Sequence, residues 1–249
     1  ARNRRNYFFV AILLLMALAQ LGVHLNALGV LSVPGWAGIS LAMDVMLFVL
    51  SVMGGRVIPM FTNNAIPGAK AVRHPWVERL ALGLVLLLLV ADAAQVAGIW
   101  LALLAALATL AHLLRLWMWQ PWKTLNTPLV WVLHAAYAWI VLHLAFRAMA
   151  AMEWLSVSAG NHALTAGAIG SMVIGMMTRT ALGHTGRKLV AGKTEVACYT
   201  LVATAAVVRV FAPLMNPAWL TDAVLVAALL WSTGFALYTW RYWAILSRD

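Results

Sequence analysis

Two long runs in this chain, at residues 81–90 and 99–111, contain no charged side chain. Such runs are typical of helices that cross a membrane, which need roughly 20 predominantly apolar residues. The composition agrees, because 64% of the residues are hydrophobic and 10% are charged, whereas soluble domains are about 45–50% apolar and about 25% charged. We therefore expect an all-α, polytopic membrane protein rather than a soluble globular domain.

Proline and glycine residues divide the chain into apolar segments of the length that a bilayer requires, roughly 17–25 residues each. We predict a bundle of about eight transmembrane helices that form a single transmembrane domain over residues 1–249. The predicted spans are residues 7–31, 37–53, 76–92, 96–119, 128–151, 161–178, 195–212 and 219–244.

The positive charges give these spans an orientation. Fifteen of the 17 Lys and Arg residues fall on one side of the predicted membrane, and only Arg147 and Arg209 fall on the other. Cytoplasmic loops carry such an excess of Lys and Arg. We therefore expect both ends of the chain in the cytoplasm. The formal net charge of +10 is thus explained by topology, and no separate basic face predicts binding to nucleic acid.

Small residues form a stripe in the sixth predicted span. Gly167, Ser171 and Gly175 follow one another at a spacing of four residues. A stripe of small residues lets neighbouring helices approach closely. We expect this helix to pack inside the bundle.

Histidines at membrane depth are candidates for function, because ionisable side chains are costly there. His24, His143 and His162 are predicted in the outer half, and His112 and His134 near the inner ends of their spans. His134 and His143 are nine residues apart, which places them on opposite faces of one helix and about 13 Å apart. They cannot ligate one metal ion, so a metal or heme site must recruit ligands from different helices. The alternative for each histidine is a hydrogen bond between helices.

Charged residues at span ends are open to two interpretations. Asp44, in the outer part of the second span, could pair with an outer histidine and raise its basicity, or it could be a helix-end residue near the headgroups. Arg56, Arg115 and Arg179 stand at inner helix ends. Guanidinium groups there would suit heme propionates, but topology alone also explains cytoplasmic arginines.

Two predicted cytoplasmic segments are candidates for a functional role beyond connecting helices. They are GGRVIPMFTNN at residues 54–64 and MTRTALGHTGR at residues 177–187. In each, glycines allow unusual backbone at a helix end, and an arginine stands at the boundary of the span. Non-helical backbone at such depth is tolerated where it faces protein or a cavity. We therefore expect both segments to leave the helical conformation.

These two segments resemble motifs of the NnrS family. The strings WVLHAAYAW at residues 131–139 and NHALTAGAIG at residues 161–170 resemble it as well, and the similarity extends over nearly all of the chain. The resemblance implies a bacterial inner-membrane protein that contains heme and copper and is linked to denitrification and nitric oxide resistance. It places cofactor-binding residues at His24, Arg56, His112, Arg115, His134, Tyr137, His162, Arg179 and His184, with His24, His134 and His162 as metal ligands.

Several aspects stay open at this stage. Family members are usually longer, and this chain resembles their C-terminal two-thirds, so an upstream segment is expected to contribute to cofactor binding. No residue set specifies a reaction. Expected partners are membrane lipids, nitric oxide, and other membrane subunits or the upstream segment. The alternatives to an NnrS-like protein are a small-molecule or metal-ion transporter and a non-catalytic subunit of a larger complex.

Overall fold

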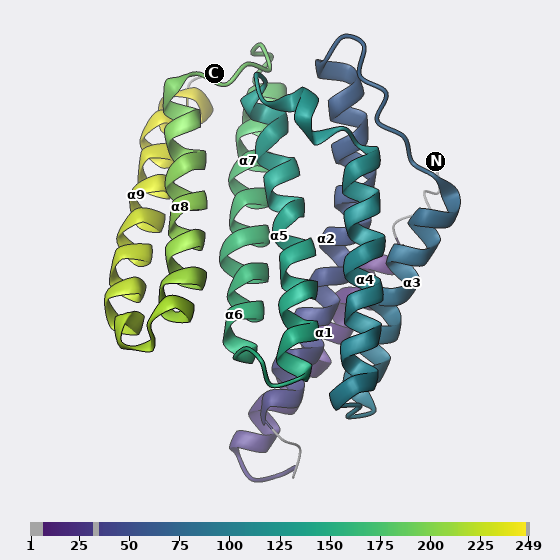
Figure 1. Cartoon of the computed structure of the whole chain (residues 1–249). Coiled ribbons are helices and arrows are strands. Elements are labelled where there is room, and N and C mark those ends of the chain that lie inside the picture. Colours follow the sequence, from purple (N-terminus) through teal and green to yellow (C-terminus); the bar gives the residue numbers. More distant parts are fainter. Residues whose placement is uncertain (1–6, 32–34, 248–249) are drawn as a thin grey trace.

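The computed structural model describes residues 7–31 and 35–247, and each regular element in these ranges is a helix (Figure 1). The elements are α1 (Tyr7–Ala27), α2 (Gly35–Ala65), α3 (Pro75–Ala93), α4 (Gly98–Met118), η2 (Pro121–Thr124), α5 (Pro128–Ala151), α6 (Val157–His162), η3 (Ala163–Ile169), α7 (Gly170–His184), α8 (Lys193–Met215), η4 (Pro217–Trp219) and α9 (Leu220–Leu246). Among the described residues, α1, α2, α4, α5, α8 and α9 are long and apolar enough to cross a membrane. The expected all-α membrane fold is confirmed.

The two remaining predicted spans correspond to α3 and to the continuous run α6–η3–α7. The α3 helix carries three charged residues, Glu78, Arg79 and Asp92, within its 19 residues, and it is therefore not among the six. It nevertheless packs against α2 and α4. The sixth predicted span is longer than expected and changes its winding in η3, which is a π-helix.

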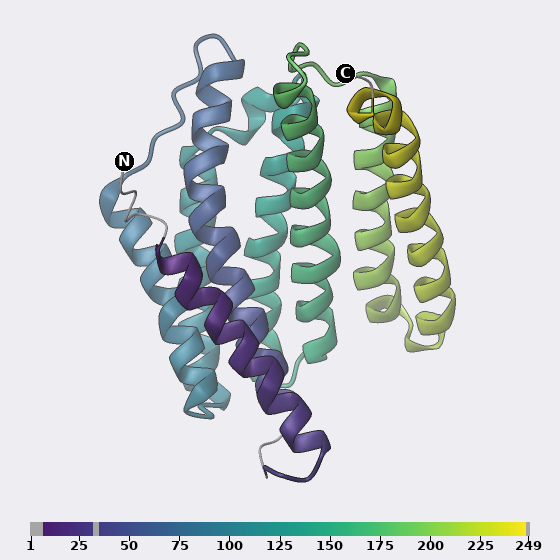
Figure 2. The ribbon, with the colours of Figure 1, turned by 180° about the vertical axis from the view of Figure 1, so that it is seen from behind.

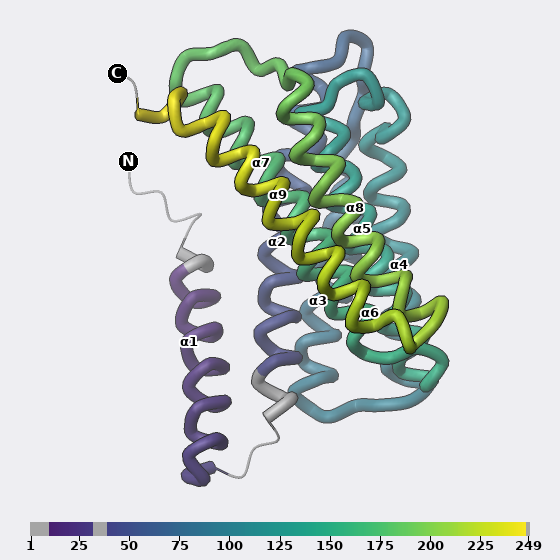
Figure 3. Tube along the Cα trace, turned by 90° about the vertical axis from the view of Figure 1, so that its left-hand side faces the viewer, coloured from purple at the N-terminus to yellow at the C-terminus, as the bar shows by residue number. Residues whose placement is uncertain are grey.

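The α5 helix is at the centre of the bundle, because it contacts α2, α4, α6, η3 and α7. The α1 helix lies along α2 on the outside of the bundle (Figure 2). The α8 and α9 helices form a pair at the edge of the bundle away from α3 and α4 (Figure 1), and this pair faces the viewer in Figure 3. We call the end formed by residues 66–74, 119–127 and 185–192 the basic end, and the end formed by residues 94–97, 152–156 and 216–219 the far end (Figure 1). The loops predicted to be cytoplasmic meet at the basic end.

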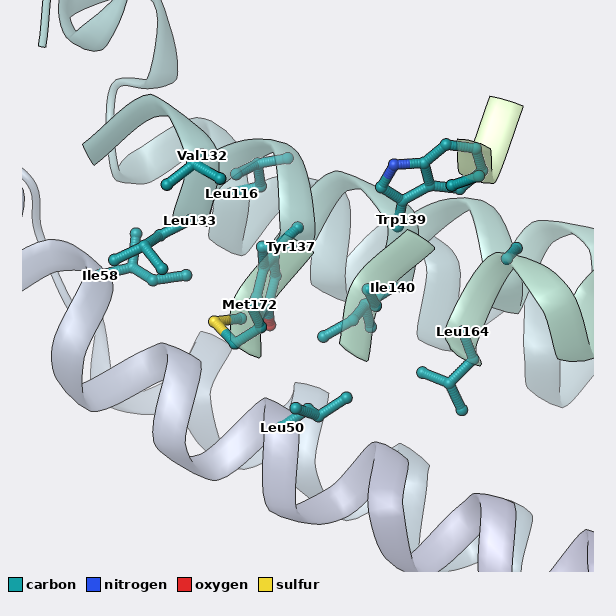
Figure 4. Packing of buried hydrophobic residues seen from close by; sticks show 14 of the residues in the cluster. Leu50, Ile58, Leu116, Val132, Leu133, Tyr137, Trp139, Ile140, Leu164 and Met172 are labelled. Atoms are coloured by element: carbon teal, nitrogen blue, oxygen red, sulfur yellow. The ribbon is translucent and has the colours of Figure 1, made fainter. Parts of the chain in front are cut away.

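The core of the bundle is apolar and centred on α5. Figure 4 shows part of it, with side chains from α2, α4, α5, η3 and α7. Leu133, Tyr137 and Ile140 of α5 are fully buried. Polar side chains that reach this region must therefore find their partners within the protein.

The two segments expected to leave the helical conformation are mostly helical, so that prediction was wrong. Residues 54–64 belong to α2, which continues through Pro59 to Ala65. The glycines Gly54 and Gly55 serve close packing instead: a Cβ at Gly54 would lie 3.1 Å from the Tyr137 ring, and one at Gly55 would clash with Arg115. In the second segment, α7 continues to His184.

The expectation that the small-residue helix packs inside the bundle is confirmed. A Cβ at Gly167 would clash with the ring of Trp139 on α5, and one at Gly175 would lie 2.8 Å from a methyl group of Val132. Ser171 is buried as well. The glycines thus let η3 and α7 approach α5 closely.

Candidate functional site

The α5 helix presents buried polar side chains along its whole length. His134, Tyr137 and His143 are at most 3% exposed, and Arg147 is partly buried with 13% of its side chain exposed. Because α5 is central, these groups find partners on α2, α3, α4 and α6. Tyr137 and Arg147 each belong to a cluster of polar residues, whereas His134 and His143 each have a separate environment.

The first cluster, here the basic-end cluster, consists of Glu78, His112, Arg115 and Tyr137. Arg115 of α4 donates from Nε and Nη2 to the two carboxylate oxygens of Glu78, at 2.7 and 2.6 Å. Its Nη1 donates to the Ser51 carbonyl at 2.7 Å and to the Tyr137 hydroxyl at 2.8 Å. A buried ion pair is tolerated when its geometry is good and its remaining donors are satisfied, and Arg115 meets both conditions.

The hydrogen bonds of this cluster fix the tautomer of His112. Its Nε2 lies 3.2 Å from the Ala81 carbonyl, which can only accept, so Nε2 carries the proton. Its Nδ1 lies 2.8 Å from the Tyr137 hydroxyl, which accepts from Arg115 and therefore donates to His112. Both ring nitrogens of His112 are thus occupied, and a bond from His112 to a metal would have to replace one of these hydrogen bonds.

His134 has one occupied and one bare nitrogen. Its Nε2 lies 2.9 Å from Oγ1 of the buried Thr62 on α2. The Thr62 hydroxyl donates its own proton to the Ile58 carbonyl at 2.8 Å, so it accepts from His134. The Nδ1 of His134 therefore carries a lone pair, and it is buried with no hydrogen-bond partner among the described residues.

In His143, which lies farther along α5 toward the far end, the roles of the two ring nitrogens are reversed. Its Nδ1 donates to the Gly160 carbonyl at 2.8 Å, and its buried Nε2 has no partner in the described part of the chain. His143 is not among the residues that the resemblance to the family places at the cofactor. Its orientation by a backbone carbonyl is nevertheless typical of metal-binding histidines.

The second cluster, here the far-end cluster, consists of Asp44, Asp92 and Arg147. The Arg147 guanidinium bonds to Oδ1 of Asp44 on α2, and its Nη2 lies 2.7 Å from Oδ1 of Asp92 on α3. Of the two interpretations of Asp44, pairing with an outer histidine is not found, because its carboxylate binds Arg147. Arg147 is the better partner because it carries a permanent charge and projects from α5 at the same depth.

The other predicted histidine sites lie near helix ends. His24 is exposed in the last turn of α1, with its Nε2 3.1 Å from Nε2 of Gln20. His162 ends α6 and donates from Nδ1 to the Ser158 carbonyl at 2.7 Å. It also lines a groove of about 420 Å³ between α6, α8 and the start of α9. His184 is exposed at the end of α7.

Two predicted arginine sites lie in the basic-end half of the bundle. Arg56 is half-buried on α2. Arg179, also half-buried, stacks its guanidinium 3.5 Å above the ring centroid of Phe61 and so ties α7 to α2. Of the predicted site residues, His112, Arg115 and Tyr137 are joined in one hydrogen-bond network.

Three or more His, Cys, Asp or Glu side chains that could share one metal ion are not found together anywhere in the described ranges. His24, His134 and His162 accordingly do not converge. Glu78, Thr62 and the far-end cluster were not predicted as site residues. The signal that could have found them is their isolation, since Glu78, Asp92 and Arg147 are charged residues within otherwise apolar helices.

The family model of NnrS, described as NnrS protein, matches residues 1–249. The chain belongs to the NnrS family. No curated protein and no solved structure matches it. The family match agrees with the membrane fold and with the motifs at residues 54–64 and 177–187.

The donor chemistry of the NnrS chain fits a metal or heme group at single histidines. His134 Nδ1 and His143 Nε2 are bare imidazole nitrogens, and neutral imidazole is a common ligand of heme iron and copper. Arg115 and Tyr137 fit less well as partners of heme propionates, because their donors already bind Glu78, Ser51 and His112. Each histidine could thus supply one ligand, with further ligands from elsewhere.

Proposed function

We propose that this NnrS-family chain is a heme- and copper-binding protein of the bacterial inner membrane that acts in nitric oxide resistance or denitrification. Family membership supports the link to nitric oxide. A bound heme would supply an iron that can bind nitric oxide. The chain itself would hold and orient the group, and its apolar helices would exclude water from it.

The bare Nδ1 of His134 is the observation that carries the cofactor part of this proposal. An unpaired polar nitrogen in an apolar interior costs about 1–3 kcal/mol, so its burial needs a compensating bond. The Thr62 hydroxyl holds the opposite nitrogen as a donor and so presents Nδ1 as a lone pair. This is the arrangement in which a hydrogen-bonded neighbour fixes the tautomer of a ligating histidine. We therefore assign His134 as a ligand of heme iron or copper.

His134→Gln tests this assignment in the purified full-length protein. A glutamine can replace the hydrogen bond to Thr62, but its amide is a poor ligand for heme iron or copper. We expect heme absorbance or copper content to fall, while the amount of inserted protein stays close to wild type. His74→Gln is the matched control, because His74 is exposed before α3, and it should leave absorbance and metal content unchanged.

Thr62→Val separates ligation from packing. Valine has nearly the same shape as threonine but cannot accept the His134 proton, so the imidazole loses its orientation. Loss of such an orienting group typically lowers metal affinity by about 10–100-fold. Retention of both heme and copper in His134→Gln would contradict the assignment of His134, and wild-type protein without either cofactor would contradict the proposal as a whole.

A further inference from the structure

The two polar clusters differ in their charge balance. In the basic-end cluster, one buried guanidinium, that of Arg115, meets one carboxylate, that of Glu78, so the buried pair is neutral. In the far-end cluster, one guanidinium, that of Arg147, meets two carboxylates, those of Asp44 and Asp92. If both carboxylates were ionised, the far-end cluster would carry a charge of −1.

This surplus charge would be deeply buried. Asp44 is 1% exposed, and its Oδ2 is buried with no hydrogen-bond partner among the described residues. A charge without compensation in an apolar interior is costly, and in membrane helices such residues mark proton relays and ion pathways. The far-end cluster therefore needs one further positive charge.

The neighbouring groups do not supply that charge. The α2 helix packs against α1, α3 and α5, and nearer the basic end it also contacts Arg115 of α4 and Arg179 of α7, which bind other groups there. On α3 the nearby ionisable group is Asp92, a second acid, and on α5 it is His143, whose Nδ1 donates to the Gly160 carbonyl rather than to Asp44. On α1 it is His24, whose Nε2 lies beside Gln20. Arg147 is thus the only cation paired with Asp44 in the described ranges.

We propose that the far-end cluster is a proton-binding site, in which Asp44 and Asp92 share one exchangeable proton above Arg147. Two carboxylates in one site disfavour ionisation of both. Binding forms one O–H bond at a carboxylate oxygen and breaks one O–H bond of a hydronium ion, which is left as water, and the charge of the cluster goes from −1 to 0. Asp92 is 17% exposed near the end of α3, so the proton exchanges with water at the far end of the bundle. The site does not depend on a bound heme or copper.

Infrared spectroscopy of the purified full-length protein tests this site, because a protonated carboxyl has a carbonyl band distinct from that of a carboxylate. The chain has only seven acidic residues, so the band can be assigned by substitution. We expect the wild type to show this band at neutral pH, with a shift in heavy water that reports exchange. Asp44→Asn and Asp92→Asn should each abolish it, because either change leaves a neutral pair with Arg147.

Two comparisons make the test decisive. Glu195→Gln is the matched control, since Glu195 is also buried but accepts from the Gly192 amide and the Tyr242 hydroxyl, and it should leave the band in place. If Asp44→Asn does not fold, Asp92→Asn at the more exposed position carries the test alone. Absence of the band in wild type, its persistence in Asp92→Asn, or its loss in Glu195→Gln would overturn the proposal.

Discussion

Gly55 of α2 lies directly against the guanidinium of Arg115 on α4. A Cβ at position 55 would clash with Nη2 and Cζ of Arg115, which donates from Nη2 to Glu78 at 2.6 Å. The absence of a side chain at Gly55 is therefore a condition for the basic-end cluster. A helical glycine in an apolar stretch can thus serve the placement of a charged group on another helix.

Gly55→Ala should strongly destabilise the protein. The added methyl group must displace Arg115 from Glu78, and breaking a buried ion pair costs about 3–5 kcal/mol. The melting temperature of the detergent-purified protein measures this effect. Gly83→Ala is the control, because Gly83 lies within α3 and a Cβ there meets no atom within 4 Å. Alanine at that position should stabilise the helix by up to about 1 kcal/mol, and equal losses in the two variants would contradict the packing argument.

Glu78→Gln should be harmful for a related reason. The change leaves the Arg115 guanidinium, which is 1% exposed, without its counter-ion, and we expect a loss of about 3–5 kcal/mol in the free energy of unfolding. Arg73 provides the comparison, because it also pairs with Glu78, at 3.2 Å, but is 49% exposed. Arg73→Gln should cost no more than about 1 kcal/mol, as expected for a surface ion pair. Thermal unfolding of both variants in the same detergent shows whether Glu78 stabilises the protein mainly through the buried Arg115 or through the exposed Arg73.

Tyr137→Phe should disturb the same cluster more mildly. Without the hydroxyl, His112 Nδ1 loses its donor, while Arg115 Nη1 keeps the Ser51 carbonyl. One buried acceptor is left unsatisfied, which costs about 1–3 kcal/mol. Tyr238→Phe is the matched control, since its hydroxyl makes no hydrogen bond to a described residue, and it should unfold at the wild-type temperature. A Tyr137→Phe protein as stable as wild type would show that the hydroxyl of Tyr137 is dispensable.

The sequence predicted the helices better than their ends. Apolar runs and flanking prolines locate helices well, and Pro75 and Pro128 indeed begin α3 and α5. Pro59 lies in the segment at residues 54–64 that was expected to leave the helical conformation, yet α2 continues through it, because neighbouring helices can satisfy the backbone groups that a proline frees. The π-helix η3 has no pattern of its own in the sequence, since its winding follows from packing against α5.

The candidate site was predictable only in part. The depth of His112 and His134 follows from their positions along the apolar runs, but the nitrogen that each presents depends on Ala81, Tyr137 and Thr62, which lie on other helices or turns. The pairing of Asp44 with Arg147 joins residues 103 positions apart. Residue spacing within one helix carries no information about such contacts, because they depend on how the helices cross.

The orientation of the bundle is the last prediction, and cysteine labelling can test it directly. The structure gathers the loops with most of the Lys and Arg residues at the basic end, and the positive-inside rule predicts that this end faces the cytoplasm. Cys198 is the one cysteine of the chain and is 1% exposed, so it should react little with a membrane-impermeant thiol reagent. In intact cells, Ser156→Cys at the far end should be labelled, whereas Lys123→Cys at the basic end should be labelled only after the membrane is opened. Labelling of Lys123→Cys in intact cells would reverse the orientation, and the proton-binding site at the far end would then exchange with the cytoplasm rather than with the outer side.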